Sequence, residues 1–158
     1  MAGLVEIVRP TRPELVVNDS FAATLDTRVG SARAAWRDID LDPERFVHYL
    51  ATRLEPPTAS VEQLHVEDLF LACACLEALP RAQVAFDRAC GSGIDLALSA
   101  AGVERADLPA MRQQIQDRLL SATPPKLASY AGRGSLGSWV RIFAMREAAR
   151  LLAAGAPA

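Results

Sequence analysis

Six residues near the end of the sequence match the pattern of a dinucleotide-binding loop. The run Gly132-Arg133-Gly134-Ser135-Leu136-Gly137 follows G-x-G-x-x-G, in which glycines let the backbone approach a pyrophosphate at a helix N-terminus. That chemistry requires a buried strand before the glycines and an acidic residue on a second strand about 20 residues later. The preceding segment, PPKLASYA, is not a strand, and no second strand follows. We therefore expect a tight turn in which Ser135 caps the next helix, with no nucleotide cofactor.

The cysteines and histidines are the other residues whose types could do chemistry. Cys73 and Cys75 lie two apart, so on a helix their thiols point about 200° apart and cannot share a metal ion. Cys90 is distant, and His48 and His65 fall on different predicted helices. We expect the cysteines to be small buried residues and predict no metal site. Because no nucleophile–base set or carboxylate pair near a histidine is present either, the sequence predicts no enzyme.

The composition favours an all-α protein. Hydrophobic residues make up 51% of the chain, charged residues 23% and aromatic residues only 6%, and alanine and leucine dominate. No segment alternates with a period of two, and no internal repeat is visible. The predicted architecture is a compact helical bundle of five or six helices. No apolar run reaches the roughly 20 residues of a membrane span, and the N-terminus lacks a signal-peptide pattern, so we expect a cytoplasmic protein without membrane contact.

Capping residues and apolar spacing place the helices of this bundle. Asp42 and Pro43 begin a helix that should stop at Pro56-Pro57, and Ser60 with Gln63 forms a capping box for a strongly apolar helix. The expected helices cover about residues 42–55, 61–79, 80–90, 94–101, 106–122 and 135–154, with Gly91-Ser92-Gly93 as a break and Gly102 as a stop. Residues 1–40 show no sustained period beyond one short helix at 31–39, and a disordered tail and a strap across the bundle both remain open.

The charge is unevenly distributed along the chain. Residues 126–158 carry five basic residues and one acidic residue, a net charge of +4, whereas the first 125 residues carry −6. On a helical wheel, Trp139, Arg146 and Arg150 cluster within about 40° beside the apolar face. An aromatic ring flanked by guanidinium groups suits single-stranded nucleic acid, through stacking and phosphate neutralisation. The alternatives are a solvated basic face and a packing arrangement without a ligand.

The order of these motifs is more specific than any one of them. DLFLACACLEALPRAQVAFDRAC precedes a glutamine-rich amphipathic helix, and a loop with YAGRGSLGSW leads into the Trp-led helix W-V-R-I-F-A-M-R. This order resembles region 2 of bacterial sigma-70 family transcription factors, in particular extracytoplasmic-function members of myxobacterial type. The resemblance covers about residues 64–152, which suggests a sigma region 2-like domain at 41–158 after an extension at 1–40. No region 4-like helix-turn-helix domain is visible, and both a fragment of a longer factor and a single-domain relative remain open.

The resemblance implies two binding surfaces. In the family, the helix before the loop docks on the clamp helices of the RNA polymerase β′ subunit. Its expected counterparts here are Arg112, Gln113, Gln114, Gln116 and Asp117. The loop and the Trp-led helix open the promoter and hold the non-template strand at the −10 element, and here these implied DNA-binding residues are Tyr130, Arg133, Trp139, Arg141, Arg146 and Arg150. An anti-sigma factor is a further partner that the family admits.

Two departures from the family pattern bear on the expected function. Gln114 stands where the family has an acidic residue, and Arg146 stands where it has asparagine. The leading hypothesis is a sigma-like initiation factor domain that binds RNA polymerase core and the promoter −10 strand. The alternative is a protein-interaction helical module, a degenerate sigma-like domain without DNA recognition.

Overall fold

A computed structural model describes residues 3–54 and 61–155, which contain seven α-helices and no β-strand. The all-α prediction is therefore confirmed, with seven helices instead of five or six. The helices are α1 (Val5–Thr11), α2 (Asp19–Ala35), α3 (Pro43–Ala51), α4 (Val66–Leu76), α5 (Ala82–Ala100), α6 (Leu108–Gln116) and α7 (Leu136–Ala153). Short 3₁₀ turns lie at Val61–Gln63, Arg105–Asp107 and Lys126–Ser129, and a π-helical turn at Asp117–Ser121 extends α6.

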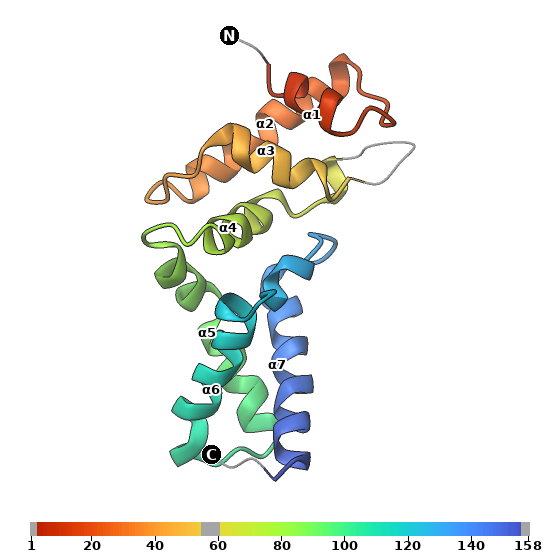
Figure 1. The fold of residues 1–158 in the computed structure, drawn as a ribbon. Helices are drawn as coiled ribbons and strands as arrows, with labels where there is room; N and C mark the ends of the chain where they lie inside the picture. The colour runs from red at the N-terminus through yellow and green to blue at the C-terminus, as the bar shows by residue number, and fades with distance from the viewer. Residues whose placement is uncertain (1–2, 55–60, 156–158) are drawn as a thin grey trace.

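The helices form two groups joined through α4 (Figure 1). In the first group, α1 contacts α2 and α3, and α4 packs against both α2 and α3. In the second group, α5 contacts α6 and α7 and lies beside them in the lower half of the view (Figure 1). The two groups meet where α4 contacts α5 and the 3₁₀ turn at Lys126–Ser129. The loop that leads into α7 therefore lies directly at this junction.

The first 40 residues contribute two helices to the hydrophobic core. Asn18 caps α2 by accepting a hydrogen bond from the Phe21 amide at 2.8 Å. Phe21, Leu25 and Val29 recur every four residues and are buried against α4 and its neighbours. The expected short helix at 31–39 is thus the end of a 17-residue helix that stops at Ala35. Through these two helices, residues 5–35 share the core of the chain.

The next two helices follow the expected caps only in part. Asp42 accepts a hydrogen bond from the Glu44 amide at 3.3 Å, and Pro43 occupies the first turn of α3, as predicted. The predicted stop at residues 56–57 and the cap at residue 60 lie outside the described residues. The apolar helix α4 begins only at Val66, after the 3₁₀ turn at Val61–Gln63, and ends at Leu76 instead of residue 79. Seven of its eleven residues are buried, among them every residue from Leu69 to Ala74, as its apolar sequence predicted.

The predicted break at Gly91-Ser92-Gly93 is wrong, because α5 continues through it without interruption. A single glycine costs a helix interior about 1 kcal/mol, which packing can offset. Here Gly91 is buried beneath the guanidinium of Arg112 from α6, which occupies the space that a Cβ would need. The glycine therefore serves close packing between α5 and α6. Gly102, with φ of +92°, does end this helix, as predicted.

Buried side chains from all seven helices form one continuous core. The cysteines behave as predicted small buried residues, since Cys73 and Cys90 are each only 3% exposed and Cys75 is half-buried. Burial raises the pKa of all three thiols from 9.0 to about 12. None of the helices in the described ranges combines the length and apolar character needed to cross a membrane.

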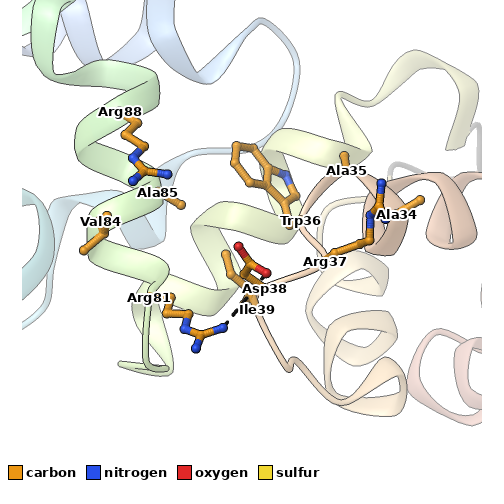
Figure 2. A pocket seen from close by; sticks show the side chains of 10 residues that line it. All are labelled: Ala34, Ala35, Trp36, Arg37, Asp38, Ile39, Arg81, Val84, Ala85 and Arg88. Carbon is orange, nitrogen blue, oxygen red and sulfur yellow. Dashed lines mark ion pairs between the residues drawn. The ribbon is translucent and has the colours of Figure 1, made fainter.

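A cavity of about 740 Å³ separates the end of α2 from the start of α5. Figure 2 shows the side chains that line it, with Trp36, Arg37 and Asp38 on one side and Arg81 and Arg88 on the other. The cavity lies between the two helix groups, with residues 34–39 of the first group on one side and residues 81–88 of the second group on the other.

Candidate functional site

The glycine-rich loop before α7 is bound to the start of α4. The amide of His65 donates a hydrogen bond to the carbonyl of Gly132 at 2.8 Å. Gly132 has φ of +77°, a left-handed conformation that glycine adopts without strain. A Cβ at this position would lie 2.5 Å from Cδ1 of Leu69, so the loop backbone sits directly on the α4 side chain. Position 132 thus requires glycine for two reasons, the left-handed backbone and the close contact with Leu69, and both reasons concern the fold.

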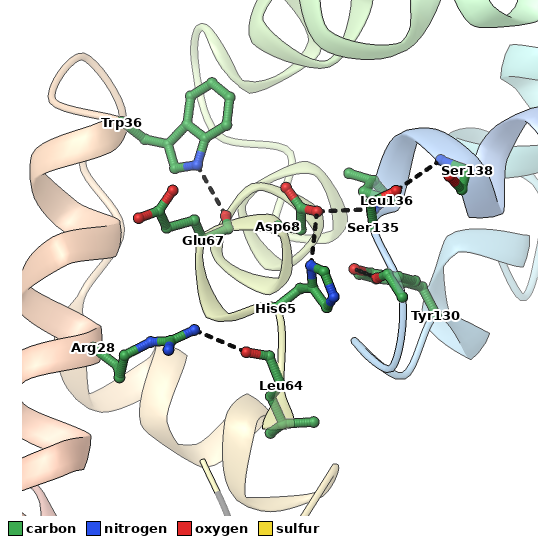
Figure 3. A network of polar contacts seen from close by, with 11 residues as sticks. Arg28, Trp36, Leu64, His65, Glu67, Asp68, Tyr130, Ser135, Leu136 and Ser138 are labelled. Carbon is green, nitrogen blue, oxygen red and sulfur yellow. Dashed lines mark hydrogen bonds and ion pairs between the residues drawn. The ribbon is translucent and has the colours of Figure 1, made fainter. Parts of the chain in front are cut away.

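The first turn of α7 is capped by side chains from two segments (Figure 3). Ser135 accepts a hydrogen bond from the Ser138 amide at 3.2 Å, which confirms the predicted N-cap. The amide of Leu136 donates to the carboxylate of Asp68 on α4 at 2.8 Å. A carboxylate at a helix N-terminus satisfies free amides and complements the helix dipole. The position where a nucleotide phosphate binds in the matching motif is thus taken by Asp68.

Arg53, which follows α3, fastens the other side of the loop. Its guanidinium donates to the carbonyls of Tyr130 and Ala128 at 3.3 and 2.9 Å. Arg133 donates in return to the carbonyl of Arg53 at 2.6 Å. The Arg53 guanidinium also stacks 3.6 Å above the ring of Tyr49. The predicted DNA-contacting residue Arg133 is therefore exposed at its surface but committed to the junction through this bond.

An aromatic row runs from this loop along α7. Tyr130 is only 1% exposed, and its hydroxyl donates to the carbonyl of Gly134 at 2.6 Å. Burial raises the pKa of Tyr130 well above its usual range. Trp139 lies 5.5 Å from the Tyr130 ring and stacks on Phe143, with 6.3 Å between ring centroids and 11° between planes. Trp139 keeps an accessible edge, whereas Tyr130 is a core residue and does not offer its ring to a ligand.

The basic residues of α7 fall into two kinds. Arg150 donates to the carboxylate of Glu147 at 2.9 Å, and Arg118 reaches the same carboxylate at 2.8 Å. Glu147 is buried and so joins the π-helical turn to α7. Arg141 and Arg146 are exposed, and within the described part of the chain neither has an ion-pair partner. The cations accessible to a polyanion on this helix are therefore mainly these two.

The same outer face of α7 also carries exposed apolar side chains. Ile142, Met145 and Leu152 are 46%, 49% and 41% exposed. At 100° per residue, Met145 and Leu152 lie close to Arg141 on the wheel. The outer face is thus a mixed basic and apolar surface, and we call Arg141, Ile142, Met145, Arg146 and Leu152 the outer face of α7. Exposed apolar stripes of this kind mark contact surfaces in many proteins.

The residues that the sequence assigned to α6 separate into exposed and internal positions. Gln113, Gln114 and Asp117 are exposed, and the Gln113 amide donates to the Asp117 carboxylate at 2.9 Å. Gln116, by contrast, is buried and donates to Asp87 of α5 at 2.6 Å. The remaining member of the predicted set is half-buried.

That half-buried residue is Arg112, which lies over Gly91 and pairs with Asp95 at 3.3 Å. Both partners belong to α5, so Arg112 and Gln116 hold α6 against α5. The exposed contact surface therefore consists of Gln113 and Gln114 on α6 and Asp117 at the start of the π-helical turn.

Three residues at this site escaped the sequence analysis. Asp68 and Arg53 act on a loop more than 60 residues away, and no local pattern announces such contacts. Glu147 did leave a signal. On the helical wheel it falls between Leu136 and Val140, in the middle of the apolar face, which indicates a buried carboxylate that needs a cation.

Comparison with known proteins assigns no role to these residues. No protein-family model matches the chain, and no curated protein or solved structure is significantly similar to it. Within residues 3–54 and 61–155, histidine, cysteine and carboxylate side chains do not gather in a group of three or more that could hold a metal ion. The features that could bind a partner are therefore the exposed surfaces of α6 and α7, which the rigid junction holds in place.

Proposed function

We propose that the chain is a sigma-like transcription initiation domain, which binds the clamp helices of the RNA polymerase β′ subunit and contacts the promoter −10 non-template strand. The observation that carries this proposal is the presence of two distinct solvent-facing surfaces on consecutive helices, joined by a fixed loop. They are the polar surface of α6 and the basic, partly apolar outer face of α7. Such a domain binds its partners without making or breaking bonds, and it would act in the cytoplasm.

The polar surface of α6 suits a coiled-coil partner. Gln113 and Gln114 offer both donors and acceptors, and Asp117 adds one negative charge one turn further along. Because Arg112 and Gln116 already bind α5, the helix is held rigidly while these side chains remain available. Little ordering entropy is then lost on binding, which favours association.

The outer face of α7 suits a single strand. Arg141 and Arg146 can neutralise phosphates, and the exposed edge of Trp139 with Ile142 offers apolar surface for unstacked bases. Arg150 contributes less than its position on the wheel predicted, since Glu147 already pairs with it. The proposed strand contacts therefore exclude Tyr130, which lies in the core.

The polymerase contact is tested by titrating a fluorescent β′ clamp-helix fragment with the chain. We expect binding that weakens about tenfold when Gln113 and Gln114 are both replaced by alanine, a loss of about 1.4 kcal/mol. The matched control is Gln83→Ala, an exposed glutamine on α5, which should leave the affinity unchanged. Absence of binding at high micromolar concentration would contradict the proposal.

The strand contact is tested with a labelled single-stranded oligonucleotide of −10 type at several salt concentrations. The Arg141→Ala, Arg146→Ala pair should lower the affinity and reduce the salt slope by about 1.4, since each single-strand phosphate contact contributes about 0.7. The control pair Arg9→Ala, Arg33→Ala removes two exposed cations from α1 and α2. Equal losses for the two pairs would show that the contact is not on α7.

The exposed apolar side chains favour a second candidate, a protein-interaction module without DNA recognition. Met145 and Ile142 are about half exposed, more than a surface devoted to phosphates requires. On this alternative the chain binds the β′ fragment, or another protein, but shows no salt-dependent affinity for the oligonucleotide. Met145→Gln would then weaken protein binding while the Arg141→Ala, Arg146→Ala pair leaves it nearly unchanged.

A further inference from the structure

The cavity between α2 and α5 has an elongated, cationic wall. Val84, Ala85 and Arg88 form one stripe along the first two turns of α5, and Arg81, the left-handed residue directly before the helix, lines the cavity at the start of this stripe. Seven residues of helix span about 10 Å, which places a guanidinium at either end of the stripe and apolar surface between them. The opposite wall is formed by Trp36 and the residues that follow it (Figure 2).

The charge of the cavity is positive, although it lies in the acidic part of the chain. Three arginines and one aspartate line it. Arg81 is 4.0 Å from Asp38, and both side chains are largely exposed, so this ion pair neutralises little. Among the described residues, Arg37 and Arg88 have neither an ion pair nor a side-chain hydrogen bond. A local excess of two positive charges thus faces solvent, where it attracts an anion.

The floor between the arginines is apolar and preformed. Val84, which is 54% exposed, and Ala85 both line the cavity, and Ala85 lies on the side of α5 that is turned toward Trp36 (Figure 2). Across from it the indole N–H of Trp36 donates to the carbonyl of Glu67 at 2.9 Å, which fixes the ring. A ligand that fills this site therefore needs apolar groups as well as negative charge.

We propose that this cavity binds an acidic peptide segment of a partner protein. Carboxylates of the segment would pair with Arg81 and Arg88, and an apolar side chain between them would cover Val84 beside Trp36. A single carboxylate or phosphate is too short to reach both ends of the 10 Å stripe, whereas a peptide spans it in about three extended residues. Guanidinium groups pair with carboxylates through paired hydrogen bonds, which gives such a contact its orientation.

The geometry of Arg81 supports this assignment. Its backbone has φ of +71°, a left-handed conformation that costs a residue with a side chain roughly 1 kcal/mol relative to glycine. Its guanidinium points toward Asp38, with which it forms an ion pair at the cavity (Figure 2). The site lies on α5 and α2, away from the surfaces of α6 and α7 in the proposed function, and it does not depend on that proposal.

The test uses the full chain and a random copolymer of glutamate and tyrosine, which presents many acidic and apolar sequences at once. The chain has two tryptophans, Trp36 and Trp139, so binding can be followed through their indole N–H resonances. We expect the Trp36 signal to shift on addition of the copolymer while the Trp139 signal stays in place. The Arg81→Ser, Arg88→Ser pair should weaken binding at least about tenfold, because both ends of the stripe are lost.

Matched variants locate the effect and guard against misfolding. The Arg141→Ser, Arg146→Ser pair removes the same charge from α7 and should change copolymer affinity less than about threefold. Val84→Glu alters an exposed side chain, so the fold is retained, and it should abolish binding by placing a carboxylate in the cavity. Circular dichroism of each variant checks that the helices are intact.

Several results would overturn the proposal. One is the absence of copolymer binding to the wild-type chain, and another is equal binding by the Arg81→Ser, Arg88→Ser pair. A shift of the Trp139 resonance alone would place polyanion binding on α7. If the Arg81→Ser, Arg88→Ser pair loses as much affinity for a single-stranded oligonucleotide as for the copolymer, the cavity is a nucleic-acid phosphate site. The β′ fragment titration is independent of all these outcomes, so the two proposals can fail separately.

Discussion

The first turn of α7 and the outer face of the same helix differ in how many of their polar groups have partners. At the first turn nearly every polar group has a partner, because Asp68, Ser135 and the carbonyl of Gly134 satisfy amides and the Tyr130 hydroxyl. Further along the helix, Arg141 and Arg146 on the outer face of α7 make no ion pair within the described residues. A single stretch of sequence thus combines a fixed junction with an available surface.

This contrast shows which part of a motif carries structure and which part can carry function. Gly132, Tyr130 and Ser135 form contacts and hydrogen bonds within the junction, so this part of the motif serves to attach α7 to α4. The residues of the outer face beyond them are exposed, and Arg141 and Arg146 make no ion pair within the described residues. A rigid attachment behind an exposed face is the arrangement expected of a preorganised binding surface.

The largest effect should come from breaking the junction at Gly132. Gly132→Ala forces a side chain into a left-handed backbone and against Leu69, and we expect a loss of about 2–4 kcal/mol in the free energy of unfolding. The control is Gly134→Ala, whose Cβ would meet no heavy atom within 4 Å. Urea denaturation should separate the two variants, and equal stability would show that the loop rearranges freely.

A smaller, pH-dependent effect should come from Cys90, which lies beneath the junction. Burial, with the nearby charges of Asp68 and Asp87, raises the pKa of this thiol from 9.0 to about 12. The unfolded chain therefore loses the thiol proton above about pH 9 while the folded chain keeps it, so stability falls as pH rises from 9 towards 12. Between pH 8 and pH 10 the loss from this thiol is about 1.4 kcal/mol.

Urea denaturation in the presence of a reductant measures this dependence. Cys90→Ala should flatten the decline by that amount, whereas the neighbouring exposed Ser92→Ala should leave the pH profile parallel to that of the wild-type chain. Parallel profiles for Cys90→Ala and the wild type would mean that the thiol is accessible to solvent in the folded state.

Removal of the cap on α7 should cost less than the glycine substitution. Asp68→Ala leaves the Leu136 amide without its acceptor, and losses at helix caps are typically about 1 kcal/mol. Glu67→Ala removes an adjacent exposed carboxylate that accepts no helix amide, so it should stay within about 0.5 kcal/mol of the wild type. If both variants unfold at the same urea concentration, Ser135 alone is sufficient to cap the helix.

The smallest effect on stability should come from the outer face. Arg141→Ala and Met145→Ala remove exposed side chains, so each should change the free energy of unfolding by less than about 0.5 kcal/mol. The same variants should weaken binding to a partner of α7. A stability loss above about 1 kcal/mol would show that this face packs against the rest of the chain, and would contradict the distinction between a structural first turn and an available outer face.

The sequence predicted local structure better than the contacts between segments. Capping at Asp42 and Ser135 and the buried character of α4 followed from neighbours in the chain, and the structure confirms them. The helix α2 had the same kind of signal, with Asn18 followed by Phe21 and Leu25, but two nearby prolines obscured it.

The predicted site residues separate according to tertiary packing that no spacing reveals. Tyr130 and Gln116 look like surface residues in the sequence, yet both are buried. The Tyr130 hydroxyl is satisfied by the nearby carbonyl of Gly134, and the Gln116 amide by Asp87 on another helix. Arg150 looks free on a wheel but shares Glu147 with Arg118 from another segment. Helical periodicity predicts the direction of a side chain, but it does not predict which residue of another segment that side chain contacts.

The contact of Arg112 with Gly91 links two positions that are 21 residues apart. Because the end of the Arg112 side chain fills the space above the glycine, a larger residue at 91 would displace the guanidinium and with it the Asp95 ion pair, unless a shorter residue stood at 112. Relatives of this chain should therefore change these positions together, as a coupled substitution. A glycine that looks like a helix break in one sequence would then appear, across many sequences, as one half of a covarying pair.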